Sequence, residues 1–512
     1  MSSEYNNILI VEKEVKNKSL DNSSLHNSTS SESLMENKAY LSNIKYININ
    51  SKKFILASII FFLLLLSFFA FCNLNKLQNK NEHKIKLISF ASEKKENNLI
   101  ELKFTCKDPS IPVQIFNNTN QIKSHIKSLK IGGKEENITE NYNFGLSGKY
   151  KVTIQFKDKI NSLKNLFSGC GQLLIADFTD FDSEELADMS GLFEGCLRLK
   201  YVEFGDFNTK KVINMENLFN GCKSLYDLNL STFDTSNVQY MNGMFSGCEE
   251  LYMLDLYNFN TKNVLRMDNM FSGCTYLFIL NMTNFDTSNV QNMSKMFDTC
   301  TNLPSLNISH FRTPKVESME SIFHNCRKIM TLNLSLWETP SVTSFSSMFS
   351  GCTKLSNISL EKFDTRNAIY MDNMFLRCLN LTDLNIKHFK TSKVVNMENM
   401  FNGCEILTSL DVSSFDTSNV ENMSGMFGSC FSLRSLNLSN FRTKKVERMD
   451  YIFNHNIMLT SLDISNFDTI NVEMKKNVFN GISVKGKIYL NSDNISNGIL
   501  KQLPRKWEFI EK

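Results

Sequence analysis

The chain has 512 residues, of which 42% are hydrophobic, and its formal net charge is +3 at pH 7. A chain of this length and apolar content can bury a large core. Its near-balanced charge does not indicate a protein that binds polyanions, so we predict no nucleic acid among its partners.

The N-terminal 72 residues divide into a polar and an apolar segment. Residues 1–53 are rich in Ser, Asn, Lys and Glu and bury too little apolar surface to fold, so we predict a disordered tail. Residues 54–72 (FILASIIFFLLLLSFFAFC) hold no charge, which predicts a transmembrane helix. Three lysines precede this span and four follow it within fifteen residues, so the positive-inside rule does not decide its orientation. We expect an uncleaved signal anchor with the C-terminal domain outside.

Residues 73–159 contain no repeat. Three of their segments, 99–106, 110–116 and 149–156, alternate apolar and polar residues in the manner of half-buried strands. A solenoid needs a cover over the apolar cross-section at its end. We therefore predict a membrane-proximal β-rich cap over residues 73–159.

A repeat of 26 residues occupies residues 160–490. A phenylalanine stands three residues before each cysteine that marks the repeat, and this column continues at Phe453 and Phe479, which gives about 13 units. A fixed period of this size is typical of a solenoid. The marking cysteines are Cys170, Cys196, Cys222, Cys248, Cys274, Cys300, Cys326, Cys352, Cys378, Cys404 and Cys430.

Each unit combines a strand pattern with a helix pattern. Leu254 and Leu256 are spaced as on one face of a short strand. The apolar residues of 264–271 then recur at i, i+3, i+6 and i+7, the spacing of a helical face, and Gly273 follows where a helix would end. We predict an α/β solenoid, a leucine-rich-repeat array of helix-strand units with one parallel sheet. Residues 491–512 are expected to form a C-terminal cap.

The order F-x-x-C-x-x-L-x-x-L-x-L-x-x-F resembles the BspA-like leucine-rich repeat, and the segment NFDTSNVQNMSKMF is similar to its longer variant. The resemblance covers about two thirds of the chain. An ordinary leucine-rich repeat places Asn or Cys after the L-x-L strand, whereas this chain has Phe there and Cys before the strand. The resemblance implies a surface protein used for adhesion or recognition.

One cysteine per unit is compatible with a disulfide ladder, a metal stack or a buried small residue. Adjacent strands lie about 4.8 Å apart, within disulfide range. However, stacked side chains point in parallel, and no C-x-x-C pair supports zinc. Asn456 stands in the same column, which favours a buried group that hydrogen-bonds loop backbone. We predict a structural column of buried thiols.

No catalytic or metal-binding motif is present in the sequence. We find no P-loop, G-x-S-x-G, H-E-x-x-H or EF-hand loop, and the seven histidines show no ligand spacing. We therefore predict a protein that is not an enzyme and that holds no cofactor or metal.

Two columns face outward from the predicted sheet. Inside the L-x-L steps lie amides and carboxylates, with Ser359 as the exception, and hydrogen bonds between strands explain them as well as ligand contact does. Two residues earlier, the N-terminal units carry apolar and aromatic residues. Together with one further tyrosine they make a candidate partner site: Ile175, Tyr201, Met253, Tyr257 and Ile279.

We predict a non-catalytic, single-pass membrane protein, anchored through residues 54–72, that displays the array at the cell surface. The array would serve adhesion or recognition of a protein or glycan partner. The alternative is an intracellular membrane-tethered scaffold with the solenoid in the cytoplasm. Twelve N-x-S/T sequons follow residue 73, and their use as glycosylation sites distinguishes the two.

Overall fold

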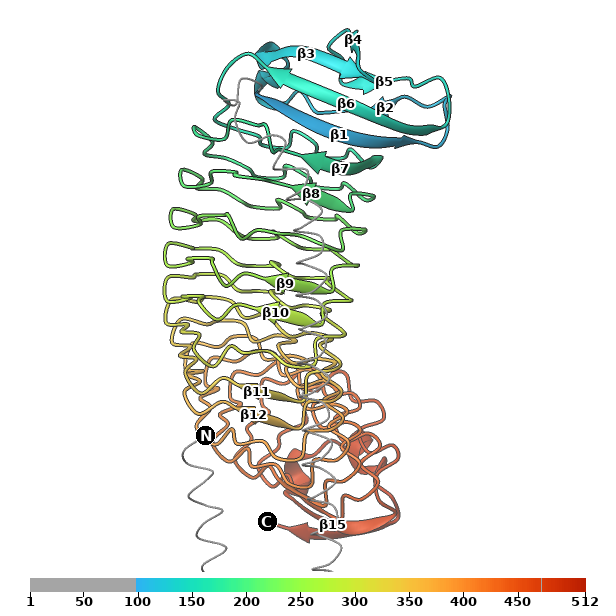
Figure 1. Ribbon diagram of the computed structural model, residues 1–512. Helices are drawn as coiled ribbons and strands as arrows, with labels where there is room; N and C mark the ends of the chain where they lie inside the picture. The colour runs from blue at the N-terminus through green and yellow to red at the C-terminus, as the bar shows by residue number, and fades with distance from the viewer. Residues whose placement is uncertain (1–97, 471) are drawn as a thin grey trace, which may run out of the picture. The chain divides into compact units, whose positions relative to one another are not determined.

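The structure is a computed structural model that describes residues 98–470 and 472–512, which belong to one compact unit (Figure 1). The predicted tail, residues 1–53, and the predicted transmembrane helix, residues 54–72, lie outside the described residues. Within the described ranges, no helix has both the length and the apolar character needed to cross a bilayer. The predicted single-pass membrane protein at the cell surface is therefore not supported, and neither is the membrane as a partner.

The first strands of the described chain form an antiparallel sheet that continues into the repeats. The sheet has the strand order β4-β3-β6-β1-β7-β8, in which β1 pairs antiparallel with β7, the first strand of the repeats. Alternate residues of β1, such as Leu102 and Phe104, are buried against the core, as their spacing predicts. The elements before the repeats are β1 Leu99–Cys106, β2 Val113–Gln114, η1 Thr119–His125, β3 Ile126–Ile131, β4 Lys134–Glu136, β5 Asn141–Tyr142 and β6 Gly148–Phe156.

Each 26-residue repeat makes one coil of a β-solenoid (Figure 1). Where neighbouring coils form strands, these are parallel and in register, as in the pairing of Leu254 with Leu280. Half a coil further along the chain, twelve single parallel bridges join equivalent residues from Ser162 to Met474. The strands of the coils are β7 Leu173–Asp177, β8 Tyr201–Glu203, β9 Met253–Asp255, β10 Ile279–Asn281, β11 Thr331–Asn333, β12 Asn357–Ser359, β13 Ser435–Asn437 and β14 Ser461–Asp463.

The C-terminal elements continue the last sheet in parallel, in the order β13-β14-β15-β16. Trp507 on β16 is buried, and its indole Nε1 donates a hydrogen bond to the carbonyl of Ser483 at 2.7 Å. These contacts place an aromatic side chain against the end of the core. The elements are β15 Lys485–Leu490, η2 Ser492–Asn494, α3 Asn497–Leu500 and β16 Lys506–Glu511.

The predicted helix in each repeat is wrong, and the fold is a β-solenoid rather than an α/β solenoid. In the described part of the chain, the only α-helix is the four-residue α3. Val264, Met267, Met270 and Phe271 are buried as expected, but the backbone of this segment does not bond as a helix does. The N–H groups of Asn269 and Phe271 donate to carbonyls of the next coil at 2.9 Å, whereas the N–H of Met270 donates three residues back. Alternate amides therefore bond between coils.

A left-handed backbone conformation at two positions per coil explains why no helix forms. Asn269 has φ 58° and Gly273 has φ 74°, and the equivalent residues of every other coil also have positive φ. A right-handed helix cannot pass through such a residue without ending. Because the two positions are four residues apart, each segment becomes a series of tight turns. Residues that tolerate positive φ, mainly Gly and Asn, fill these columns.

The interior of the solenoid is a set of stacked apolar columns. The phenylalanines from Phe167 to Phe479 stack ring on ring, with centroids 5.5 to 6.1 Å apart. Columns of leucine, methionine and valine surround them and are buried throughout. Each coil therefore completes the packing of its neighbours, as solenoid architecture requires.

Candidate recognition surface on the outer face of the coils

The marking cysteines form a buried, hydrogen-bonded column. All eleven marking cysteines are buried and free of disulfides. From Cys196 to Cys430, each thiol donates to the carbonyl of the phenylalanine 29 residues earlier, at 3.0 to 3.4 Å. Burial raises the pKa of the thiols, to about 12 at Cys274 and Cys352, so they are poor nucleophiles. In the same column, the Asn456 Oδ1 accepts the N–H of Cys430 at 2.9 Å.

A threonine column, which the sequence analysis missed, joins the coils in a similar way. Eleven threonines from Thr209 to Thr469, one per coil, are at most 1% exposed. Thr261 Oγ1 donates to the carbonyl of Asp286 at 2.9 Å and accepts the N–H of the same residue at 2.8 Å. Ser183 occupies this position in the first coil and accepts the N–H of Asn208 at 2.7 Å. In sequence, threonine within N-T-K-N is indistinguishable from an ordinary turn residue.

The outward column of amides and carboxylates mainly forms local turns. Asp255 Oδ1 accepts the N–H of Tyr257 at 3.1 Å, and Asp411 does the same for Ser413 at 3.0 Å. A hydrogen bond from the backbone N–H of residue i+2 to the side-chain oxygen of residue i is typical of Asx turns. Between strands, Asn281 Nδ2 also donates to Asp255 Oδ1 at 2.9 Å. Much of the polarity of this column is therefore used within the fold.

Two polar clusters in the described part of the chain bring titratable side chains together. His324 Nδ1 lies 2.8 Å from Asp298 Oδ1. Burial alone would raise the pKa of Asp298, but hydrogen bonds from His324, Thr299 and Ser272 outweigh it, and the pKa lies below its usual value. Ser272 and Thr299 both donate to the carboxylate, so neither hydroxyl is placed to lose a proton to the imidazole.

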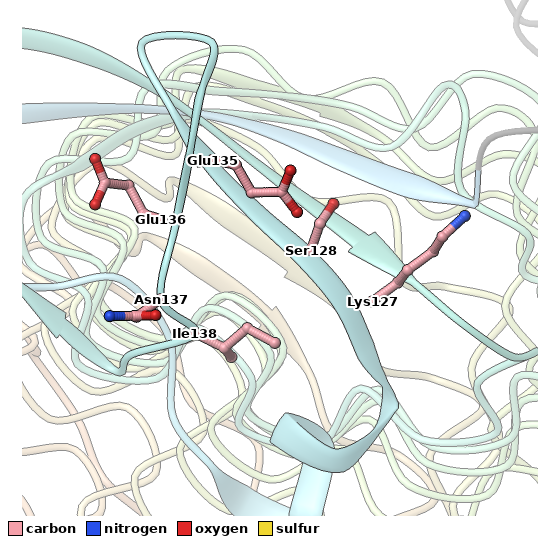
Figure 2. A pocket seen from close by; sticks show the side chains of 6 residues that line it. All are labelled: Lys127, Ser128, Glu135, Glu136, Asn137 and Ile138. Atoms are coloured by element: carbon pink, nitrogen blue, oxygen red, sulfur yellow. The ribbon is translucent and has the colours of Figure 1, made fainter.

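The second cluster is an open hollow of about 490 Å³ on the β3–β4 hairpin. Its charged groups are Lys127, Glu135 and Glu136 (Figure 2). In Figure 2 these side chains are spread along the hairpin and do not converge on one point. An arrangement of this kind offers no paired acid and base for a bound substrate.

The predicted partner-site residues lie on the outer side of the coils but are mostly half-buried. Ile175 faces Lys103 of β1 across the antiparallel pair, and Met253 and Ile279 are neighbours in register. The hydroxyl of Tyr201 donates to Glu203. Among the five, Tyr257 alone is well exposed, at 57%. Their role in binding remains a prediction.

A more exposed aromatic column lies one residue earlier in the repeat. Tyr226, Tyr252 and Phe278 are 53%, 45% and 37% exposed. The rings of Tyr252 and Phe278 stack with centroids 5.5 Å apart and planes within 6° of parallel. Tyr276, two residues before Phe278, is 60% exposed. The sequence contained the signal, because three aromatic residues stand 26 apart on consecutive coils.

We define the aromatic–acidic surface as residues 223–231, 249–257 and 275–283, on three consecutive coils. Five exposed aromatic side chains and four carboxylates lie in these segments, together with a single basic residue, Lys223. Lys223 Nζ is 2.7 Å from the carboxylate of Glu249. The aromatic residues are Tyr226, Tyr252, Tyr257, Tyr276 and Phe278, and the carboxylates are Asp227, Glu249, Glu250 and Asp255.

The geometry defines a leucine-rich-repeat β-solenoid with an aromatic face. The family model described as "Mycoplasma protein of unknown function, DUF285" matches residues 161–278, 266–383, 327–415 and 405–496. The matches together span well over half of the chain, so the chain belongs to this family. The narrower resemblance to BspA-like repeats remains a prediction.

Comparison with other known proteins adds distant likenesses. No curated protein matches the chain. A leucine-rich repeat protein from Bacteroides ovatus is similar at 19% identity and a TM-score of 0.40, over 70% of this chain and 88% of that one. One from Leptospira interrogans gives 12% identity and a TM-score of 0.22, over 69% and 93%. The functional domain of InlJ from Listeria monocytogenes, described as including a cysteine ladder, is similar at 12% identity and a TM-score of 0.14. The match covers 70% of this chain and 74% of that one.

Proposed function

We propose that this chain is a non-catalytic recognition protein that binds a protein partner through the aromatic–acidic surface. The observation that carries the proposal is a comparison between coils. At the position of Tyr226, Tyr252 and Phe278, later coils have Ser356, Thr382 and Thr408, and yet they form the same parallel stack. The solenoid therefore does not require the aromatic side chains.

The chemistry of the surface supports recognition. Exposed aromatic residues that gather in one place supply the large, rigid contacts that dominate the energy of protein interfaces. The stacked strands present a wide and shallow face, which suits a macromolecule better than a small ligand. A partner that is itself a cell-surface component would make this binding adhesion.

We propose in addition that the elements at each end serve as covers for the repeats. Strand β1 on the N-terminal side and Trp507 on the C-terminal side both lie against apolar residues of the terminal coils. Repeat arrays need such covers because an open end would expose the apolar core to water. The covers keep the array monodisperse, so that binding is left to its lateral face.

Affinity capture with a matched pair of variants tests the proposed function. In the surface variant, Tyr226→Thr, Tyr252→Ser and Phe278→Thr install residues that other coils carry at this position. The control variant, Tyr370→Asn, Ile406→Asn and Ile457→Thr, removes three exposed apolar side chains from distant coils in the same way. The full-length wild type, the surface variant and the control variant are each used to capture partners and then titrated with the captured protein.

We expect the wild type and the control variant to bind the same protein with equal affinity. The surface variant should bind it at least about tenfold more weakly. The melting temperature of the surface variant should equal that of the wild type, because none of the three side chains is buried. Undiminished binding by the surface variant would refute the proposal.

A further inference from the structure

We infer that the segment bound by the aromatic–acidic surface is cationic, an extended stretch of a protein rich in arginine or lysine. This inference rests on the proposed function and adds the chemistry of the partner to it. It comes from two features that coincide on the same three coils: an excess of carboxylates and a set of exposed aromatic rings.

The carboxylates of the surface are largely uncompensated. Four acidic side chains face one lysine, and that lysine is paired with Glu249. In the described chain, neither Asp227 nor Glu250 forms an ion pair, and both are exposed. A surface of this sign attracts cationic partners and repels nucleic acids and acidic polysaccharides.

The neighbouring coils lack the excess of carboxylates. The equivalent segment of the preceding coil, residues 197–205, has Tyr201 and Glu203 but also Arg198 and Lys200, so its charge is not negative. The equivalent segment of the following coil, residues 301–309, has no charged residue and no aromatic residue. The one after it, residues 327–335, begins with Arg327 and Lys328 and is basic. Acidic and aromatic residues are therefore concentrated together, which a general requirement for solubility does not explain.

Aromatic rings and carboxylates bind the same kind of side chain. A guanidinium or ammonium group is attracted to the face of a tyrosine or phenylalanine ring, and arginine also stacks on such rings. Asp227 immediately follows Tyr226 in the chain, and Glu250 is two residues before Tyr252, so these two exposed rings each have an exposed carboxylate nearby in sequence. A neutral glycan would use the rings but would gain little from the surrounding negative charge.

Fluorescence anisotropy with two matched peptides tests the inference on the full-length protein. The probe is a short, labelled peptide of alternating arginine and serine. Its control has citrulline in place of arginine, which keeps the shape and removes the charge. We expect the arginine peptide to bind about tenfold more tightly than the citrulline peptide at near-physiological salt, and its affinity to fall as salt rises.

Variants then locate the binding. A triple variant should bind the arginine peptide about tenfold more weakly, and its affinity should depend less on salt. Its substitutions are Asp227→Asn, Glu250→Asn and Asp255→Asn. These asparagines already occur at the same positions of other coils, so the fold is kept. The matched control, Asp383→Ser, Glu405→Thr and Asp411→Asn, removes three carboxylates from the same face of distant coils and should leave the affinity unchanged.

Three results would overturn the inference: equal affinity for the two peptides, equal losses in both variants, or binding of neutral oligosaccharides instead of the arginine peptide. Failure of the inference is distinguishable from failure of the proposed function. Binding of a captured protein can require Tyr226, Tyr252 and Phe278 even if the arginine peptide does not bind. In that case the proposed recognition surface is kept and the cationic nature of the partner is rejected.

Discussion

Two buried side chains in most coils join neighbouring coils through their polar atoms. The cysteine thiol donates to a phenylalanine carbonyl, and the threonine hydroxyl both donates to and accepts from the backbone of the next coil. Buried polar groups are expensive unless they are hydrogen-bonded, so these side chains fix the register of the stack as well as its spacing. Their constancy along the chain reflects this task.

Replacement of one threonine measures its contribution. Thr261→Val keeps the shape of the side chain but leaves the N–H and the carbonyl of Asp286 without their partner. We expect the free energy of unfolding to fall by about 1–3 kcal/mol, measured by denaturant titration. Thr261→Ser should cost less, because Ser183 accepts the equivalent N–H in the first coil. Thr408→Val, at an exposed position, is the control, and a loss there as large as at Thr261 would argue against the threonine column.

The residue scale was only partly predictable from the sequence. The period of 26 and the repeated apolar residues identify the buried columns, because burial follows directly from apolar spacing. The role of Thr261 was not predictable in this way, since its partner lies 25 residues away and becomes adjacent only when the coils stack. Local sequence contains no trace of that contact.

At the scale of the element, the apolar pattern of residues 264–271 has two solutions. A spacing of i, i+3, i+6 and i+7 fits one face of a helix, but a chain of tight turns buries the same residues. Asn269 and Gly273 decide between the solutions, because both adopt the left-handed conformation. Gly273 was predicted to end a helix. It is instead one of the two residues of its coil with positive φ, and every coil has two such positions.

Glycine replacements in the two left-handed columns test this explanation. Gly247→Ala should lower the free energy of unfolding by roughly 1–2 kcal/mol, the cost of a left-handed alanine, since its Cβ would meet neighbours at 3.4 Å or more. Gly247→Asn should cost less, because Asn325 already adopts this conformation in the same column. Gly243→Ala should cost more, because the new Cβ would overlap Asn217 Oδ1, which accepts a hydrogen bond from Asn220.

The measurement is again denaturant unfolding, with far-UV circular dichroism of each folded variant. An alanine that stabilised the protein or raised its helical signal would contradict the left-handed columns, since alanine favours a helix where one is present.

At the scale of the whole molecule, residues that repeat in every coil build the stack, and residues that differ between coils give one face its chemistry. The outer face was predicted to carry a partner site, because aromatic residues were visible at Tyr201 and Tyr257. The more exposed column of Tyr226, Tyr252 and Phe278 was missed. Alternation assigns inward and outward positions only within a strand, and these residues stand directly before one. Three-dimensional exposure was needed to assign it.

Hydroxyl-radical footprinting tests the recognition surface most directly, because it reports the solvent exposure of individual aromatic side chains. The full-length protein is oxidised alone and with its captured partner. We predict that oxidation of Tyr226, Tyr252 and Phe278 falls in the complex, while Tyr370 and Tyr451, which are 46% and 45% exposed on distant coils, stay unchanged. Unaltered oxidation of the first three residues, or equal protection of Tyr370 and Tyr451, would contradict a binding site on the aromatic–acidic surface.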